Sequence, residues 1–498
     1  MAKLHRLTWL DTRRLIVAIT FVSLFAMAVR APADTDTWWH LQAGKMTLES
    51  GRILQTDVFS HTRYGASWVN HSWLTQVWLY GLFKTCSYAG LGIWIGVIVT
   101  VTFLFVFLQM DGDPFVKAFI ILLAAMTSSV IWVARPQLVS LLLTAVVAYI
   151  LHLFKWRRTN RLWLLPPLFV LWVNLHAGYA LGFMVLAAFV AGELLNHVLS
   201  LVLPSDDPVT SWRGLATVVG VSFLSALVLV INPNTTRMWT YYLDTVRIGV
   251  LQDFIQEWRS PDFHHLYMQP FIWLLLSTLA AVGLSGRRID GVDLALVCGF
   301  AYSALLAGRN IAPFAVIVAP TLSRHANTAL GRLGWSLRPR PAGDMRLRKV
   351  YASVNWLLLT LLVALAGVKI VTPLSTAANE QLERKTLPVG AVEWIAENRP
   401  AGEMFNHYNW GGYLIWKLWP EHRVFVDGRT DLYGDEILRE YMAIQTARPD
   451  ALQLLDAYGV SFVLTGAHDA LSVRLDCQPD WVLRYEDDLS SLWQRVSR

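Results

Sequence analysis

Long apolar runs separated by short polar segments fill the first 371 residues of the chain. A helix that crosses a bilayer needs about 20 mostly apolar residues, and the first such run extends from Leu15 to Val29. The further runs cover residues 89–109, 115–133, 138–154, 162–175, 179–202, 214–231, 270–285, 291–308, 311–322 and 351–371. We therefore predict a polytopic α-helical membrane domain over residues 1–371 with about eleven spans, some of them short enough to tilt or break.

Basic residues recur in the connecting segments that this alternation of spans places on one side. Cytoplasmic loops of membrane proteins are enriched in Lys and Arg. If the N-terminus is cytoplasmic, the inner loops hold the clusters Lys155–Arg161, Arg213, Arg287-Arg288 and 324–349. We expect an inner (plasma) membrane protein in this orientation. A signal peptide would need cleavage beside Pro32, which is unfavourable, so we interpret the first run as a retained span.

The opposite, extracytoplasmic side then receives a first outer loop at 30–72, a long outer loop at 232–269 and the tail 372–498. Short β-rich runs in the tail, at 404–408, 423–427, 461–465 and 481–486, alternate with helical patterns at 435–446 and 450–458. This alternation predicts a small α/β domain with a mainly parallel sheet.

Composition supports the membrane interpretation. Apolar residues make up 55% of the chain and charged residues only 16%, whereas soluble domains carry roughly 25% charged residues. The composition therefore argues against a soluble enzyme, a disordered chain and a nucleic-acid binder. The net charge of +6 comes from the basic clusters of the predicted inner loops. Cys86, Cys298 and Cys477 are far apart, which favours neither a disulfide framework nor a zinc site.

Two carboxylates, Asp34 and Asp36, directly follow the first span, and apolar residues then recur at helical spacing from Trp38 to Leu48. The pattern predicts a helix along the bilayer surface with Trp anchors. The two carboxylates can bind Mg²⁺ or Mn²⁺ through oxygen ligands, supply a general base, or simply cap the helix.

Several motifs together resemble the GT-C superfamily of membrane glycosyltransferases, and most closely a large group of bacterial multi-pass glycosyltransferase-like proteins. They are Asp34-x-Asp36-x-x-Trp39-His40-Leu41, Arg135-Pro136-Gln137, Asn174-x-His176 and the tail motif at Asp427-Gly428-Arg429. The resemblance implies transfer of a sugar from a polyprenyl-phosphate carrier to an extracytoplasmic acceptor (lipid, protein or polysaccharide). It further implies that one Asp of the first loop is the catalytic base or a metal ligand. Mannosyltransferase-type members have Asp-Glu where this chain has Asp34 and Asp36.

The same resemblance implies a cation that neutralises the carrier phosphate as it leaves. Arg135 and Arg309 are the leading candidates, since each follows or precedes a span on the outer side and Arg binds phosphate through two donors. The alternative is that each is an interface anchor. Asn174 and His176 are candidates for binding sugar hydroxyls, although His176 is equally suited to bridging two helix ends.

The long outer loop contains Glu257-Trp258-Arg259. Trp stacks on sugar faces while charged groups bind hydroxyls, so Glu257 and Arg259 are candidates for substrate binding. A Glu257–Arg259 ion pair is the simpler interpretation.

In the tail, Asp427 and Arg429 follow a predicted strand at its carboxyl end. Open α/β sheets place ligands at this end of their strands. The alternative is a structural turn in which Asp427 and Arg429 form an ion pair.

Two other functions remain open. A transporter or flippase predicts ionisable residues within the spans and an internal repeat, but the spans show only Glu193, Asp293 and His152 near their ends, and no repeat is evident. A non-catalytic polysaccharide-assembly subunit is the second alternative. The glycosyltransferase interpretation accounts for the polar residues of the outer loops best.

Overall fold

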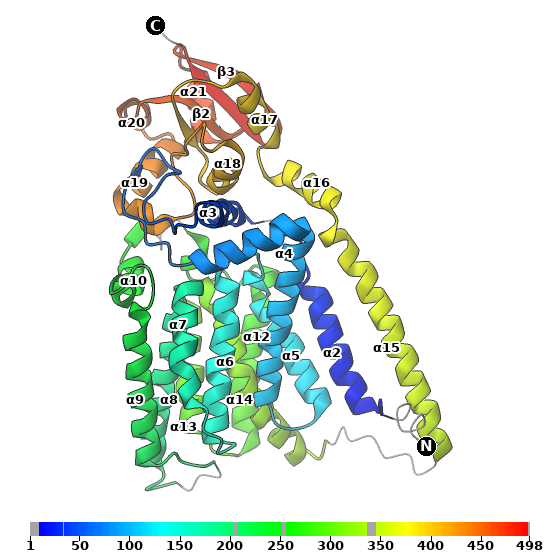
Figure 1. Ribbon diagram of the computed structural model, residues 1–498. Coiled ribbons are helices and arrows are strands. Elements are labelled where there is room, and N and C mark those ends of the chain that lie inside the picture. The colour runs from blue at the N-terminus through cyan, green and yellow to red at the C-terminus, as the bar shows by residue number, and fades with distance from the viewer. Residues whose placement is uncertain (1–8, 33, 204–206, 251–254, 336–344, 497–498) are drawn as a thin grey trace.

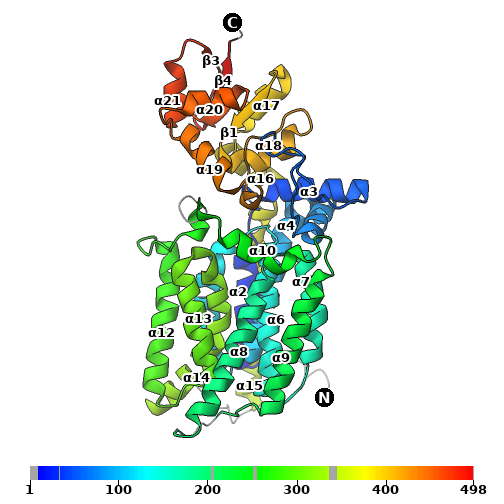
Figure 2. The ribbon, with the colours of Figure 1, turned by 90° about the vertical axis from the view of Figure 1, so that its left-hand side faces the viewer.

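The computed structural model describes residues 9–32, 34–203, 207–250, 255–335 and 345–496. It has two layers: a bundle of helices with nearly parallel axes, and a C-terminal domain with a small β-sheet over one end of that bundle (Figure 1). Figure 2 shows the same layers from the side, with helix α3 (Thr37–Ser50) between them. The end of the bundle under the C-terminal domain is therefore covered by protein.

The apolar runs of the sequence form the helices of the bundle. These are α2 (Thr12–Ala28), α4 (Trp73–Gln109), α5 (Pro114–Ser128), α6 (Gln137–Lys155), α7 (Leu165–Leu175), α8 (Tyr179–Leu199), α9 (Trp212–Leu227), α12 (Gln269–Ser285), α13 (Gly291–Leu306), α14 (Ile311–Arg332) and α15 (Met345–Leu374).

Within the described residues, seven helical stretches are long and apolar enough to cross a bilayer. They are Trp73–Gln109, Pro114–Ile131, Gln137–Lys155, Tyr179–Leu199, Trp212–Val230, Leu266–Ser285 and Arg346–Leu374. Leu162–Leu175 and Gly291–Leu306 are apolar but shorter. The chain is thus a helical membrane protein, and the total of about eleven spans stays a prediction.

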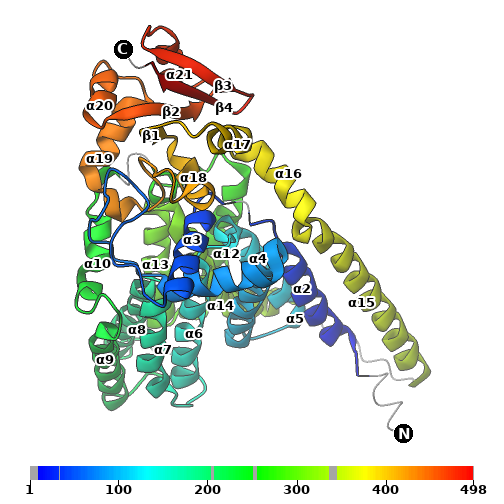
Figure 3. The same cartoon turned by 45° about the horizontal axis from the view of Figure 1, so that its top comes forward.

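Helix α4 changes direction at Ser87, whose φ of 51° and ψ of −144° are not helical. The part of α4 that begins at Trp73 lies across the end of the bundle, and the part after Ser87 descends into it (Figures 1 and 3). The predicted span at 89–109 is therefore the second part of a longer helix.

The helix predicted from Trp38 to Leu48 is present as α3, but two expectations about it are wrong. Trp38 and Trp39 are buried rather than anchored in the bilayer surface, because the C-terminal domain covers them: the Trp38 ring lies 5.6 Å from that of Tyr413. Asp36 stands at the N-cap position, yet its side chain makes no capping hydrogen bond. Its carboxylate is used elsewhere, as shown below.

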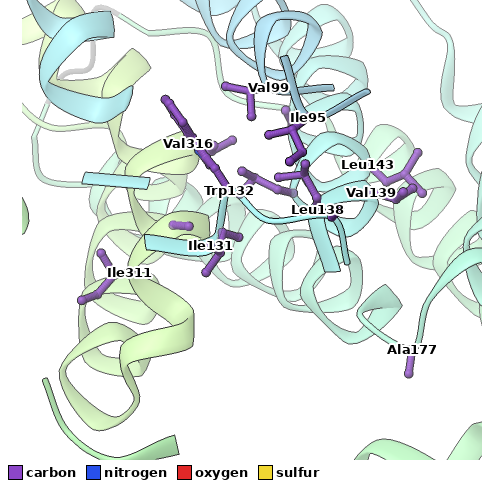
Figure 4. Close-up of a cluster of buried hydrophobic side chains, with 14 of the residues drawn as sticks. Ile95, Val99, Ile131, Trp132, Leu138, Val139, Leu143, Ala177, Ile311 and Val316 are labelled. Carbon is purple, nitrogen blue, oxygen red and sulfur yellow. The ribbon is translucent and has the colours of Figure 1, made fainter. Parts of the chain in front are cut away.

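Buried side chains fix the segment that precedes α6. Trp132 is only 1% exposed and belongs to the same hydrophobic cluster as Ile95 of α4, Leu138 of α6 and Val316 of α14 (Figure 4). Close packing of such side chains is what holds helices together in a bilayer, where the lipid is as apolar as the side chains themselves. Because Arg135 follows three residues later, this cluster holds its backbone firmly at the end of the bundle.

Charged residues inside the bundle are paired. Lys155 contacts Glu193 and lies 2.9 Å from Asp290, and all three are buried. Arg324 pairs with Asp293. Removing one partner of a buried ion pair costs about 3–5 kcal/mol, so these charges have a structural role in the bundle.

The C-terminal domain alternates helices with short strands. In chain order it contains α16 (Thr376–Thr386), α17 (Val389–Asn398), β1 (Glu403–Asn406), α18 (Gly411–Leu418), α19 (Thr430–Gln445), α20 (Ala451–Ala457), β2 (Val460–Gly466), α21 (Ala470–Asp476), β3 (Trp481–Glu486) and β4 (Ser490–Arg495). The sheet has the order β1-β2-β4-β3. Its core includes Phe405, Val463 and Trp493.

The expected mainly parallel sheet is wrong. Only β1 and β2 pair in parallel, whereas β4 is antiparallel to both β2 and β3. Strand β4 was not predicted; it follows β3 after a tight turn, which brings neighbouring strands together as an antiparallel pair. Residues 423–427 are no strand of this sheet: Val424 forms an isolated bridge with Ser60 of the first outer loop. The argument that placed Asp427 at the end of a sheet strand therefore fails.

Candidate active site

A cavity of about 540 Å³ lies between the end of the bundle and the C-terminal domain. The chain contributes to its wall from the loop before α3, the start of α6, the turn after α7, the long outer loop and the 428–431 segment. Most residues predicted from the sequence line it: Asp34, Asp36, His40, Arg135, His176, Glu257, Arg309 and Arg429. The fold thus brings together polar residues that are up to 395 positions apart (34 to 429).

Arg135 binds three carboxylates at this cavity. Its Nε lies 2.5 Å from Oδ1 of Asp34, its Nη1 lies 2.8 Å from Oε1 of Glu257, and its Nη2 contacts Oδ2 of Asp36. The Arg135 side chain is only 12% exposed. Asp34 Oδ1 also accepts the backbone N–H of Asp36 at 2.9 Å. Every nitrogen of this guanidinium is therefore engaged by an acidic side chain.

Burial and charge act in opposite directions on these acids. Burial raises the pKa of Asp36 to about 6, although Arg135 opposes this shift. The positive charge of Arg135 lowers the pKa of Glu257 and outweighs the effect of burial there. At neutral pH both side chains are largely ionised, and Asp36 is the more basic of the two.

Arg309 differs from Arg135. It belongs to the short helix η6 (Gly308–Asn310), and its guanidinium carbon lies 4.2 Å from the ring centre of Trp258, in the short helix η4 (Gln256–Trp258). Gly308 N–H donates to the carbonyl of Arg259 at 3.0 Å, which holds the two segments together. Arg309 forms no ion pair with any residue that the structure describes. Its donors remain available to an anion in the cavity.

Three histidines also line the cavity: His40, His71 and His176. Burial lowers the pKa of His71 to about 4 and lowers that of His176 well below its usual range. Gly178 N–H donates to Nδ1 of His176 at 3.1 Å, so Nδ1 is the acceptor and Nε2 carries the proton of the neutral ring. His176 therefore offers a neutral N–H donor.

The C-terminal domain closes the cavity through the turn at 427–429. A methyl group on Gly428 would stand 1.8 Å from Oδ1 of Asp36, so only glycine fits there. Behind this turn, Arg429 binds Asp427 at 2.6 Å and Asp57 of the first outer loop at 2.6 Å, all of them buried. The ion-pair interpretation of Asp427 and Arg429 is therefore correct, with Asp57 as an unforeseen partner.

Three predicted residues, Asn174, Arg259 and Asp427, lie outside the cavity lining. Asn174 accepts the indole N–H of Trp73 at 3.0 Å and donates to the carbonyl of Ile231 at 2.8 Å, so it joins helix ends. Arg259 is exposed. The expected Glu257–Arg259 pair is also wrong, because Glu257 pairs with Arg135 instead.

The sequence interpretation missed other residues of the cavity wall. Tyr241 donates to Oδ2 of Asp431 at 3.0 Å and its ring lies 5.0 Å from that of His71, so these three link the long outer loop, the C-terminal domain and the first outer loop. Tyr408 also lines the cavity. His71 stood in a polar stretch of the first outer loop and could have been noticed, whereas aromatic residues near a bilayer are too common to be a signal.

The acidic residues fit a divalent cation poorly. Such an ion takes several oxygen ligands at about 2.0–2.6 Å. One oxygen each of Asp34, Asp36 and Glu257 already contacts Arg135. No group of three His, Cys, Asp or Glu side chains in the described part of the chain is arranged to hold a metal ion.

Comparison with known proteins gives structural matches only. No family model and no curated protein matches the sequence. The apo oligosaccharyltransferase of Archaeoglobus fulgidus is similar over 92% of this chain and 70% of its own, with a TM-score of 0.58 and 12% identity. The same enzyme tethered to an acceptor peptide is similar over 98% and 75%, with a TM-score of 0.56 and 12% identity.

A third structure, archaeal AglB from Archaeoglobus fulgidus in complex with an inhibitory peptide and a dolichol-phosphate, is similar over 91% of this chain and 69% of its own. Its TM-score is 0.55 and its identity 12%. At this identity the likeness concerns the fold and not the site. The chain has the fold of this archaeal oligosaccharyltransferase, which agrees with the resemblance that the sequence shows.

Proposed function

We propose that the chain is an integral membrane glycosyltransferase that moves a sugar from a polyprenyl-phosphate carrier to an extracytoplasmic acceptor. The observation that supports this most is the cavity itself: its lining includes a largely buried, basic carboxylate, Asp36, and the guanidinium of Arg309, which forms no ion pair with the described residues. The fold agrees with this function, because a solved neighbour carries a dolichol-phosphate.

Asp36 is the proposed general base. A pKa of about 6 leaves most of the carboxylate ionised at pH 7 and makes it a better proton acceptor than an ordinary Asp. The acceptor hydroxyl would attack the anomeric carbon, and its proton would pass to Asp36. The new carbon–oxygen bond forms as the bond from that carbon to the carrier phosphate breaks, and the electron pair leaves with the polyprenyl phosphate.

Arg309 is the proposed phosphate ligand. The sequence left Arg135 and Arg309 as equal candidates, but Arg135 already binds three carboxylates. A second cavity of about 60 Å³, which has apolar residues such as Ile131, Leu141 and Leu181 in its lining, also reaches Arg309. A phosphate at Arg309 would therefore have room beside it for the first carbons of an isoprenoid chain.

The remaining residues of the wall suit the sugar. The neutral ring of His176 offers an N–H donor, as argued above, and His40 and Glu257 add further polar groups. The Trp258 ring is held by Arg309 and offers a flat apolar face, which suits the C–H face of a sugar. We assign Asp427 and Arg429 to the closure of the cavity and Asn174 to helix packing.

Analysis of lipid-linked sugars in cells that lack the chain tests this function. If the chain consumes a polyprenyl-phosphate sugar, that lipid accumulates in the deletion strain and returns to its normal level when the wild-type chain is restored. Mass spectrometry of the accumulated lipid would identify the sugar. An unchanged pool of lipid-linked sugars would contradict the proposed donor.

A further inference from the structure

The guanidinium of Arg135 lies where the sequence pattern suggests a metal ion. Asp34 and Asp36 come from the loop before α3, Glu257 comes from the long outer loop, and Arg135 comes from the segment just before α6. Two segments thus deliver three acids to a cation that a third segment of the same chain supplies. Such a convergence of like charges is stable only if a positive charge lies at its centre.

Arg135 by itself supplies the positive charge and the hydrogen-bond donors for the three carboxylates of this cluster. A guanidinium stays charged at every pH that a protein tolerates and carries five N–H donors in a fixed plane. The side chains of Asp34, Asp36 and Arg135 are at most 18% exposed, so their attraction is weakly screened. Asp34 is held further by the N–H of Asp36. One oxygen of each acid is therefore held by Arg135.

A divalent ion bound by Asp34 and Asp36 would have to displace the guanidinium or lie against it. Displacement would leave Arg135 buried and unpaired, at a cost of about 3–5 kcal/mol. Binding beside it would bring two positive charges together in a poorly solvated place, where their repulsion is larger than in water. Both arrangements are unfavourable for the chain as it folds.

We propose that Arg135 is a built-in cation that replaces a divalent metal ion at the Asp34–Asp36–Glu257 cluster. It holds the three carboxylates in place and keeps Asp36 ionisable, so the cluster works at any concentration of free Mg²⁺ or Mn²⁺. Its contribution to sugar transfer rests on the proposed function. The claim about the cation does not, because metal binding can be measured without any substrate.

The proposal predicts that removing Arg135 creates a metal site. Purified protein in detergent is titrated with Mn²⁺ and the free ion is followed by electron paramagnetic resonance. The wild-type chain and the Asp34→Asn variant should show the same weak, non-stoichiometric binding. Arg135→Ala should bind one Mn²⁺ per chain at least tenfold more tightly than the wild type, and the double change Arg135→Ala with Asp34→Asn should lose that site.

Two variants serve as controls. Arg309→Ala removes a guanidinium from the same cavity that no carboxylate of the described chain contacts, and it should gain no Mn²⁺ site. Arg135→Lys keeps a positive charge and should not gain one either. A gain in both Arg135→Ala and Arg309→Ala would contradict the special position of Arg135.

Wild-type protein alone can overturn the proposal. Stoichiometric Mn²⁺ binding that Asp34→Asn abolishes would show that a metal ion, and not Arg135, is the cation of this cluster. This comparison holds even if Arg135→Ala fails to fold. A folded Arg135→Ala chain without a new site would also contradict the proposal. None of these results depends on sugar transfer, so failure here is separate from failure of the proposed function.

Discussion

Gly428 of the C-terminal domain lies against Asp36 of the first outer loop so closely that a methyl group on it would stand 1.8 Å from the Oδ1 atom. The contact joins the α/β domain to the acid that we propose as the base. Gly428 is followed by Arg429, which is bound to Asp57 of the same outer loop. The two ends of the chain therefore build one wall of the cavity together.

The first prediction concerns this contact. Gly428→Ala should displace either the turn or the carboxylate of Asp36, because an overpacked site costs about 1–3 kcal/mol. We expect a fall of at least tenfold in sugar transfer by the purified protein. Gly299→Ala is the matched control, since a methyl group there meets nothing within 4 Å. Equal loss in both variants would contradict a specific role for Gly428.

The second prediction concerns the buried tether between the outer loop and the tail. Asp57→Ala removes a carboxylate from Arg429, which is about 1% exposed, and the loss of one partner of a buried pair costs about 3–5 kcal/mol. The C-terminal domain should become sensitive to limited proteolysis and the unfolding temperature should fall. Asp244→Ala is the control, because Asp244 also pairs with an Arg, but the pair is exposed and its atoms are 3.9 Å apart. Such a surface pair contributes little to stability. An unchanged cleavage pattern for Asp57→Ala would show that other contacts carry the tether.

The third prediction concerns pH. A base must be deprotonated to act, and burial raises the pKa of Asp36 to about 6. The value of kcat/KM should therefore be constant above this pKa and fall about tenfold per pH unit below it. Activity that returns after a brief exposure to the lowest pH, together with a circular dichroism spectrum that does not change at that pH, would exclude unfolding as the cause. A profile that stays flat to about pH 4, near the value of an ordinary Asp, would assign the base to another residue.

The fourth prediction separates the two cavity arginines. Arg309→Gln removes the charge proposed to bind the carrier phosphate, and hydrogen bonds to charged groups contribute about 1.5–3 kcal/mol. The KM for the donor should rise about 10- to 100-fold, while the KM for the acceptor stays close to normal. The control is Arg247→Gln, which changes an exposed Arg directly after α10 (Arg237–Val246). It should change neither KM. A rise in the acceptor KM alone would place Arg309 at the other substrate.

The sequence predicts the helices, because a long apolar run shows by itself that its segment is surrounded by apolar groups. It also predicts many of the cavity residues. Asp34, Asp36, Arg135 and Glu257 are recognisable as candidates because they are charged residues in a chain that is mostly apolar. The sequence does not show that these four converge on one another, since they belong to three segments whose arrangement depends on packing around Trp132 and on the covering domain. The role of Gly428 cannot be predicted from the sequence either, because it depends on the contact with Asp36.

The errors have a common physical origin. Trp38 looked like a surface anchor because its helix follows a span, but the tail folds back over it. The run at 423–427 has the composition of a strand, yet it pairs with Ser60 of the outer loop instead of entering the sheet. In both cases a contact between distant parts of the chain decided the environment, and local patterns carry no information about such contacts.

Transfer by the purified chain, reconstituted in liposomes with the lipid-linked sugar that accumulates in the deletion strain, tests the central claim most directly. Release of polyprenyl phosphate is measured for the wild type, for Asp36→Asn and for Asp262→Asn, whose carboxylate is exposed and lies outside the cavity. We expect release by the wild type and Asp262→Asn, and a loss of at least a hundredfold for Asp36→Asn, because removing a general base costs about 10²–10⁴-fold. Release at the wild-type rate by Asp36→Asn, or none by the wild type, would contradict the account.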